Sequence, residues 1–155
     1  VFFLPAGRIH SIGAGAFIAE IQQTSDITYR IFDYNRRDKN GKLRELHTEL
    51  ACDAINYSAD RNIHLQPVEV RKDTELLVNC NCFNVKKIRI SGVRNIDLSQ
   101  RDCFTILMSI DADFTIQANE CKEDLGRGHA ILVSAFVDNV TVDGNGELLV
   151  VTMPE

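Results

Sequence analysis

The chain has 155 residues, of which 45% are hydrophobic and 25% are charged, the composition of an ordinary globular protein with one domain or two small ones. Its formal net charge of −5 argues against a nucleic-acid-binding surface, which would need clustered positive charge. No stretch of the sequence is apolar for long enough to predict a membrane span.

The chain begins with a proline–glycine turn that precedes a histidine, Pro5-x-Gly7-x-x-His10. Proline and glycine predict a sharp turn between two strands, which would hold the His10 imidazole at a defined place. A catalytic zinc takes about three protein ligands, and no His-x-His or Gln-x-His pair follows in the sequence. We therefore interpret His10 as one ligand of a metal site. We expect the other ligands upstream of Val1, in a segment that was removed.

The next part of the chain is predicted to hold two strands and a turn. Residues 16–23 and 28–34 are strand-like runs separated by the polar Thr24-Ser25-Asp26, and the second run alternates in the way a strand requires. Asn40-Gly41 indicates a turn. We interpret the short basic run 36–39 as part of a solvated turn rather than as a binding patch, because it is short and carries an aspartate.

A helix is predicted over residues 46–55, where apolar residues recur with a period near 3.6. Thr48 is a candidate cap for this helix. His47 lies at its start, where a capping or solvent-exposed role is favoured over a metal-binding role.

Beyond residue 57 the sequence becomes polar, which predicts a boundary near residues 57–62. Seven strand-like runs follow, at 75–84, 85–90, 104–109, 114–118, 130–135, 139–143 and 147–153. Their spacing and polar turns predict a β-sandwich or barrel. Residues 143–146, Asp-Gly-Asn-Gly, indicate a hairpin turn, and residues 126–128 indicate a loop.

The five cysteines are Cys52, Cys80, Cys82, Cys103 and Cys121. An odd number of cysteines without a secretory signal favours free thiols in a reducing compartment, so we expect a cytoplasmic protein. Cys80 and Cys82 are two apart on one face of a predicted strand. They are interpreted as buried structural thiols rather than as a zinc pair, since no second ligand pair accompanies them.

The motif Pro5-x-Gly7-x-x-His10 resembles the second motif of the cupin superfamily, whose members are metal-binding jelly-roll barrels. The longer string, from Pro5 to Gly15 and from Ala19 to Arg36, is similar to the carboxy-terminal half of bacterial type I mannose-6-phosphate isomerases. Gly144-x-Gly146 and the apolar residues after it are similar to the final strands of that family. The resemblance is specific over residues 1–57 and looser over the remainder.

This resemblance implies a mainly β fold, a cupin-like jelly-roll β-sandwich or barrel with one short helical segment. Residues 1–57 would form the closing strands of a zinc-bearing cupin barrel plus a short helix. Residues 58–155 would form a second, metal-free cupin-like jelly roll.

The resemblance also implies an enzyme that interconverts mannose 6-phosphate and fructose 6-phosphate with one zinc per full-length protein. His10 matches the family's last zinc ligand, and the other ligands belong to the upstream half. Arg30 matches an active-site arginine, Glu20 matches an acidic residue facing the same pocket, and Arg36 falls near a further basic position. The expected catalytic residues are therefore Arg30 and Glu20, the substrate-binding residues Arg30 and Arg36, and the metal ligand His10.

The chemistry of aldose–ketose isomerisation accounts for these residue types. Proton transfer between adjacent carbons passes through an enediol, and it needs a cation for developing oxyanion charge, a general base, and a positive group for the phosphate. The Arg30 guanidinium cannot be deprotonated and suits either the phosphate or the enediolate. Glu20 suits either proton transfer or orientation of Arg30.

Two other functions fit the sequence less well. One is a non-catalytic cupin-like sugar-binding or structural module. The other is a metal-dependent oxygenase, which would usually show two histidines and a carboxylate. The expected partners are a sugar phosphate and the upstream half of the same protein, with no nucleic acid and no membrane. For the isolated fragment we expect weak or no zinc binding, no activity, and a possible homodimer formed through exposed strand edges.

Overall fold

The structure is a computed structural model that describes residues 1–25, 27–58 and 63–154. These residues divide into two compact units. The β unit comprises Val1–Phe3 and His64–Glu155, and the N-terminal unit comprises Leu4–Ile63. Residues 59–62 of the expected boundary lie outside the described residues, and the division at residues 57 and 58 stays a prediction. Among the described residues, no helix is long and apolar enough to cross a membrane.

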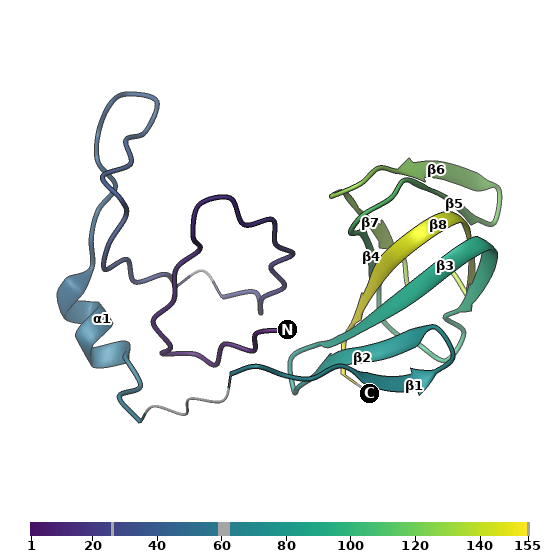
Figure 1. The fold of residues 1–155 in the computed structure, drawn as a ribbon, viewed down its shortest axis with the longest axis horizontal. Coiled ribbons are helices and arrows are strands. Elements are labelled where there is room, and N and C mark those ends of the chain that lie inside the picture. Colours follow the sequence, from purple (N-terminus) through teal and green to yellow (C-terminus); the bar gives the residue numbers. More distant parts are fainter. Residues whose placement is uncertain (26, 59–62, 155) are drawn as a thin grey trace. The chain divides into compact units, whose positions relative to one another are not determined.

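The β unit is a sheet of antiparallel strands (Figure 1). Its strands are β1 (Val68–Arg71), β2 (Thr74–Asn79), β3 (Asn84–Asp97), β4 (Thr105–Ser109), β5 (Phe114–Ala118), β6 (Cys121–Leu125), β7 (Ala130–Val133) and β8 (Asn139–Thr152). The strand order is β1-β2-β3-β8-β4-β7, and β5 pairs with both β6 and β8. Within the described part of the chain the sheet is not closed.

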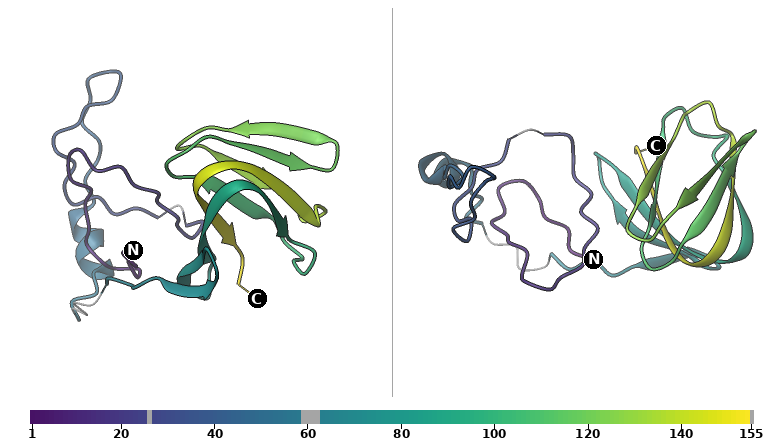
Figure 2. Two further views of the ribbon diagram at one scale, coloured as in Figure 1. Left: turned by 45° about the vertical axis from the view of Figure 1, so that its right-hand side comes forward. Right: turned by 90° about the horizontal axis from the view of Figure 1, so that it is seen from above.

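The two long strands β3 and β8 form the centre of the sheet and pair along their whole length, from Asn84 opposite Thr152 to Asp97 opposite Asn139. The other edge of β8 pairs with β4 near its end and with β5 nearer its start. One strand therefore has two successive neighbours on the same side. Both long strands curve strongly, as the two views in Figure 2 show. The side chains of the sheet form a single hydrophobic cluster.

Alternate residues of the strands supply that core, as the period of a half-buried strand requires. The cluster comprises Ile88, Ile90, Ile96, Leu98, Leu107, Phe114, Ile116, Leu125, Val133, Val140, Val142, Leu148 and Val150. Full burial of each large apolar side chain is worth roughly 1.5–3 kcal/mol. The mainly β, cupin-like sandwich with a short helix is thus confirmed, although β1 and β6 were not predicted.

The predicted hairpin turn at residues 143–146 is wrong, because β8 runs through these residues without interruption. Gly144 and Gly146 do not form a turn; they allow another segment of the chain to approach β8 closely. A Cβ atom on Gly144 would lie 2.5 Å from a ring carbon of Phe114, and one on Gly146 would lie 2.4 Å from the Cβ of Ala112. The absence of a side chain therefore lets the 111–114 segment cross β8 at these positions.

The strand position predicted for Cys80 and Cys82 is also wrong. Both residues lie in the connection between β2 and β3 and are half-buried. The Cys80 thiol donates a hydrogen bond to the Phe83 carbonyl oxygen at 3.2 Å. It therefore helps to close this turn rather than filling the core. The predicted loop at residues 126–128 is confirmed between β6 and β7.

In the N-terminal unit, the predicted helix is confirmed as α1 (Thr48–Ala54). The capping role considered for Thr48 is wrong, because Thr48 is the first helical residue and His47 occupies the N-cap position. No side-chain hydrogen bond from His47 caps the helix. Ala51 is the buried residue of this short helix.

The strands predicted over residues 16–23 and 28–34 are wrong: these segments are irregular, and Asp26 in the separator between them lies outside the described residues. Their apolar side chains are largely exposed, including Phe17 at 66% and Phe32 at 64%. A strand is stable only when it pairs with a neighbour. An alternating pattern alone does not form one here.

Two turns of the N-terminal unit are confirmed. At the first, the Arg8 N–H donates to the Pro5 carbonyl oxygen at 3.2 Å, and Gly7 adopts a φ of +80°. The strands expected on either side of this turn do not form, and Phe2 makes only an isolated bridge to His64 within the β unit. At the second, around Asn40-Gly41, the Asp38 carboxylate accepts N–H groups from Asn40 and Lys42. The basic run 36–39 thus lies in an exposed turn, as expected.

Candidate functional site

His10 is exposed just after the Pro5–Arg8 turn. Its Nδ1 atom lies 3.0 Å from the Arg8 carbonyl oxygen. A carbonyl oxygen only accepts hydrogen bonds, so this contact places the proton on Nδ1 and leaves the lone pair on Nε2. Metal-binding histidines are commonly held in this way, with one ring nitrogen donating to a carbonyl and the other facing the metal. The geometry of His10 therefore suits a single metal ligand.

The remaining ligands of a metal site are not present in the described part of the chain. Over residues 1–25, 27–58 and 63–154, no three His, Cys, Asp or Glu side chains come close enough to hold an ion. A catalytic zinc needs about three protein ligands. His10 fits one of them, and the described residues do not supply the set.

Arg30 is half-buried and is attached to residues 45–47 by three hydrogen bonds. Its Nη1 atom donates to the Glu45 carbonyl oxygen at 3.4 Å. Its backbone N–H donates to Nδ1 of His47 at 3.2 Å, and its carbonyl oxygen accepts the His47 N–H at 2.7 Å. Backbone and guanidinium are thus tied to the same short segment, directly before α1.

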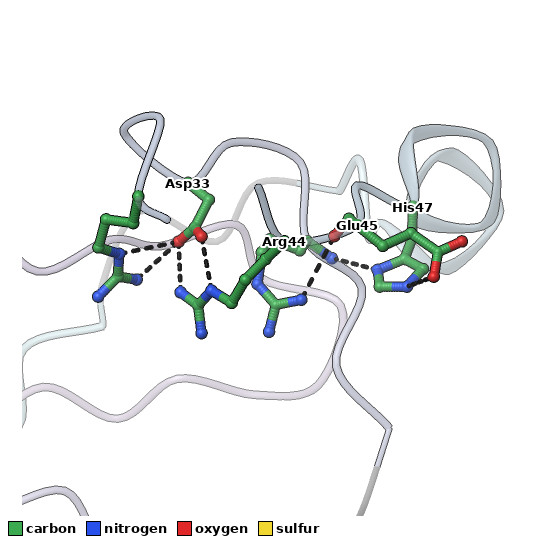
Figure 3. A network of polar contacts seen from close by, with 6 residues as sticks. Asp33, Arg44, Glu45 and His47 are labelled. Atoms are coloured by element: carbon green, nitrogen blue, oxygen red, sulfur yellow. Dashed lines mark hydrogen bonds and ion pairs between the residues drawn. The ribbon is translucent and has the colours of Figure 1, made fainter. Parts of the chain in front are cut away.

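A second cluster is formed by Asp33, Arg36 and Arg44 (Figure 3). Arg36 donates from Nε and Nη2 to Oδ1 of Asp33, at 3.0 and 2.7 Å. Arg44 donates from Nε to Oδ2 at 2.6 Å, and its Nη2 atom also contacts Oδ1. Asp33 is 6% exposed, one of the few buried residues of this unit.

The pKa of Asp33 is held well below its usual value. Hydrogen bonds from Arg44 lower it most; burial opposes this shift, and Arg36 lowers the pKa further. The same bond to Asp33 raises the pKa of Arg44. One carboxylate therefore holds two guanidinium groups, which leaves the cluster with a net positive charge. Such an arrangement suits an anion at its exposed side.

The predicted site residues are not brought together by direct contacts. Of the described residues, none bridges His10, Glu20 or Arg36 to Arg30 by a hydrogen bond or ion pair. Glu20 is exposed in the irregular 16–23 segment. Arg30 and Arg36 instead belong to two clusters: Arg30 contacts Glu45 and His47, and Arg36 is joined through Asp33 to Arg44.

Sequence reasoning missed three residues of this region. Asp33 stands three residues before Arg36, a spacing that fits a contact across the tight turn at Tyr34 and Asn35. Arg44 returns to Asp33 only because the 36–44 segment folds back, with an isolated bridge between Arg37 and Leu43. For His47 the sequence favours a capping or solvent-exposed role, and no sequence pattern indicates its contact with Arg30.

Comparison with known proteins decides the family. The family model described as "Mannose-6-phosphate isomerase, cupin domain" matches residues 72–153. The chain belongs to this family. The match covers β2 to β8, the part of the chain in which the resemblance of the motifs is looser.

Curated mannose-6-phosphate isomerases align over nearly the whole chain. ManA of Bacillus subtilis is 32% identical over 151 residues, which are 96% of this chain and 47% of that protein. The mannose-6-phosphate isomerase of Streptococcus mutans is 29% identical over 153 residues, 96% of this chain and 46% of that protein. The chain thus spans about half the length of these relatives.

Solved structures of mannose-6-phosphate isomerases share the fold. The Bacillus subtilis enzyme superposes with a TM-score of 0.67 at 28% identity, over 84% of this chain and 42% of that one. The apo enzyme of Salmonella typhimurium superposes with a TM-score of 0.56 over 72% of this chain and 29% of that one. At 13% identity, the second match supports the fold alone.

Proposed function

We propose that this chain is part of a zinc-dependent aldose–ketose isomerase that interconverts mannose 6-phosphate and fructose 6-phosphate through an enediol. Family membership and the alignment with mannose-6-phosphate isomerases over 96% of the chain support the proposal. Because the chain spans about half of these relatives, the activity is assigned to the complete protein. The cysteine content further supports the proposal that this enzyme is cytoplasmic.

The observation that carries the proposal in the structure is the state of His10. Its Nδ1–H donates to the Arg8 carbonyl oxygen, which leaves Nε2 available as a zinc ligand. The other ligands would come from residues outside this chain. When bound, zinc would polarise the sugar oxygens and stabilise developing negative charge.

Arg30 is proposed as the catalytic arginine. Its backbone and Nη1 atom are fixed by Glu45 and His47, so little conformational entropy is lost when the guanidinium meets an oxyanion. A fixed guanidinium suits the enediolate or the phosphate of the substrate. Glu20 is proposed to transfer the proton or to orient Arg30.

Arg36 is proposed to bind the substrate phosphate. Asp33 holds its Nε and Nη2 atoms, while the Arg36 side chain is 64% exposed. The cluster carries more positive than negative charge, which favours a phosphate over a neutral sugar. This assignment rests on charge and geometry at one cluster of the N-terminal unit.

The remaining part of the same protein is proposed as a partner of the N-terminal unit. Many large apolar side chains of this unit are exposed, among them Ile12, Phe17, Ile27, Phe32 and Tyr57. Exposed apolar surface on this scale is typical of an interaction surface. We propose that residues 1–57 complete a zinc-bearing barrel with that part, and that residues 58–155 form a metal-free jelly roll.

The test uses the complete protein and two single variants. We expect the wild type to hold one zinc per chain and to isomerise mannose 6-phosphate. His10→Ala should lose the zinc and reduce kcat/KM by about 1,000-fold, because several kcal/mol of charge stabilisation disappear. His129→Ala, which changes an exposed loop histidine of the β unit, should retain both properties.

Metal analysis and a coupled isomerase assay give the result. Full activity of His10→Ala would contradict the proposal. A complete protein that binds a sugar phosphate but contains no zinc and does not turn it over would instead support a non-catalytic sugar-binding module.

A further inference from the structure

His47 and Arg30 are joined by reciprocal hydrogen bonds within the N-terminal unit. The Arg30 N–H donates to Nδ1 of His47 at 3.2 Å, and the His47 N–H donates to the Arg30 carbonyl oxygen at 2.7 Å. The Arg30 guanidinium donates a hydrogen bond to the carbonyl oxygen of Glu45, two residues before His47. The position of Arg30 therefore depends on the segment that ends at His47.

These contacts define the tautomer of His47. A backbone N–H only donates, so Nδ1 must accept and the ring proton must be on Nε2. Nε2 lies 4.0 Å from the Glu45 carboxylate, toward which it points in Figure 3. The imidazole side chain is 25% exposed, and its ring also lies against Tyr29, with centroids 6.3 Å apart.

His47 also occupies a helix position where its residue type is a poor choice. N-cap positions favour Ser, Thr, Asp and Asn, whose side chains accept an N–H of the first helical turn. His47 makes no such bond, because its acceptor nitrogen is used by Arg30. Its carbonyl oxygen still accepts the Ala51 N–H at 2.8 Å. The helix thus lacks a favourable N-cap side chain at the residue that contacts the proposed catalytic arginine. Departures from local sequence preference of this kind are expected at functional sites.

We infer that His47 is a positioning residue for Arg30: its neutral imidazole accepts the Arg30 N–H and connects the arginine to the start of α1. This inference rests on the proposed catalytic role of Arg30. His47 does not touch the substrate in this arrangement. Its effect on the reaction is transmitted through the place and orientation of the Arg30 guanidinium.

Three substitutions in the complete, zinc-loaded protein separate positioning from helix capping. His47→Ala removes the acceptor and should lower kcat about 10- to 100-fold, the cost of a small misplacement of a catalytic group. His47→Asn should return kcat to within about threefold of the wild type, because its side-chain oxygen is as many bonds from Cα as Nδ1. His47→Ser caps the helix but is too short to reach Arg30, and it should be as impaired as His47→Ala.

A double-mutant comparison tests whether the effect passes through Arg30. In an Arg30→Ala background, His47→Ala should change kcat less than about twofold, since the group that it positions is already gone. Thermal unfolding of every variant, with the zinc content, identifies any loss that comes from misfolding.

Several outcomes would overturn the inference. If His47→Ser restores kcat as completely as His47→Asn, His47 serves to cap the helix. If His47→Ala lowers kcat by the same factor with Arg30 present and in the Arg30→Ala background, His47 contributes to general stability only. If Arg30→Ala lowers activity while His47→Ala does not, the positioning role is wrong and the proposed function stands. If Arg30→Ala has no effect, the catalytic role of Arg30 and this inference both fail.

Discussion

At the scale of single residues, Asp33 is the side chain on which the second cluster depends. It is a buried carboxylate that accepts hydrogen bonds from Arg36 and Arg44, two residues that a turn brings together. A buried carboxylate without such donors would be costly. The guanidinium groups therefore allow Asp33 to remain charged, and Asp33 in turn fixes their positions.

The depressed pKa of Asp33 predicts a specific acid dependence. A carboxyl group whose pKa is lower when folded stabilises the protein fully above its unfolded pKa of about 3.9, and this contribution is lost as the pH falls below that value. Asp33→Asn should therefore unfold more easily than the wild type at pH 7, and the difference should shrink below about pH 4. Thermal unfolding from pH 7 to pH 2 measures this.

Asp102→Asn serves as the control for this prediction, because Asp102 is exposed in the β unit. It should follow the wild-type profile throughout. A difference between Asp33→Asn and wild type that stays constant down to pH 2 would show that Asp33 stabilises the protein by its shape and not by its charge.

At the scale of elements, β8 determines how the β unit is built. It pairs with β3 along one edge and with β4 and β5 in succession along the other. Because β4 and β5 pair with the same edge of β8, the segment that connects them crosses close to β8. Gly144 and Gly146 lie at that crossing, against Phe114 and Ala112.

Gly144→Ala tests this crossing. Its φ of +154° disfavours a side chain, and the new Cβ would lie 2.5 Å from Phe114 and 2.9 Å from the Asp113 carbonyl oxygen. We expect the free energy of unfolding to fall by about 1–3 kcal/mol, the usual cost of overpacking. Urea unfolding measures it.

Gly13→Ala is the control, since no atom lies within 4 Å of a Cβ at that position and its φ lies outside the positive range that disfavours a side chain. It should change the free energy of unfolding by less than about 0.5 kcal/mol. Equal effects of the two substitutions would mean that β8 does not need a glycine at residue 144.

At the scale of the whole molecule, the two units differ in how completely they bury their apolar residues. The β unit has a continuous core that includes Leu107, Val142 and Leu148, each with no exposed surface. Of the residues of the N-terminal unit that the structure describes, Ala51 and Asp33 are buried, while large apolar side chains are exposed. The chain therefore has one well-packed sheet and one unit whose apolar surface is available to a partner.

This difference predicts the behaviour of the 155-residue chain produced alone. We expect substoichiometric zinc and no isomerase activity, because His10 is one ligand and a catalytic zinc needs about three. Addition of the remaining part of the complete protein should restore both. Metal analysis and the isomerase assay, before and after mixing, measure the effect. Tightly bound zinc at one ion per isolated monomer would contradict it.

Much of the fold was predictable because strand periodicity is local. The strand-like runs at 104–109, 114–118 and 130–135 predicted β4, β5 and β7. The period near 3.6 predicted α1. The same reasoning failed for 16–23 and 28–34, since a strand also needs a partner, and for residues 143–146, where glycine permits a crossing rather than a turn.

The family resemblance, the mainly β class and the candidates His10 and Arg30 follow from the amino-acid sequence alone, because motifs and periodicity are patterns of consecutive residues. Three further features required the folded structure: the tautomer of His10, the contact of His47 with Arg30, and the link from Arg36 to Arg44 through Asp33. His10 makes its contact just after the Pro5–Arg8 turn, and the contacts of His47 and Arg44 are made where the backbone folds back on itself. No spacing along the chain specifies such a contact until the turns that produce it are in place.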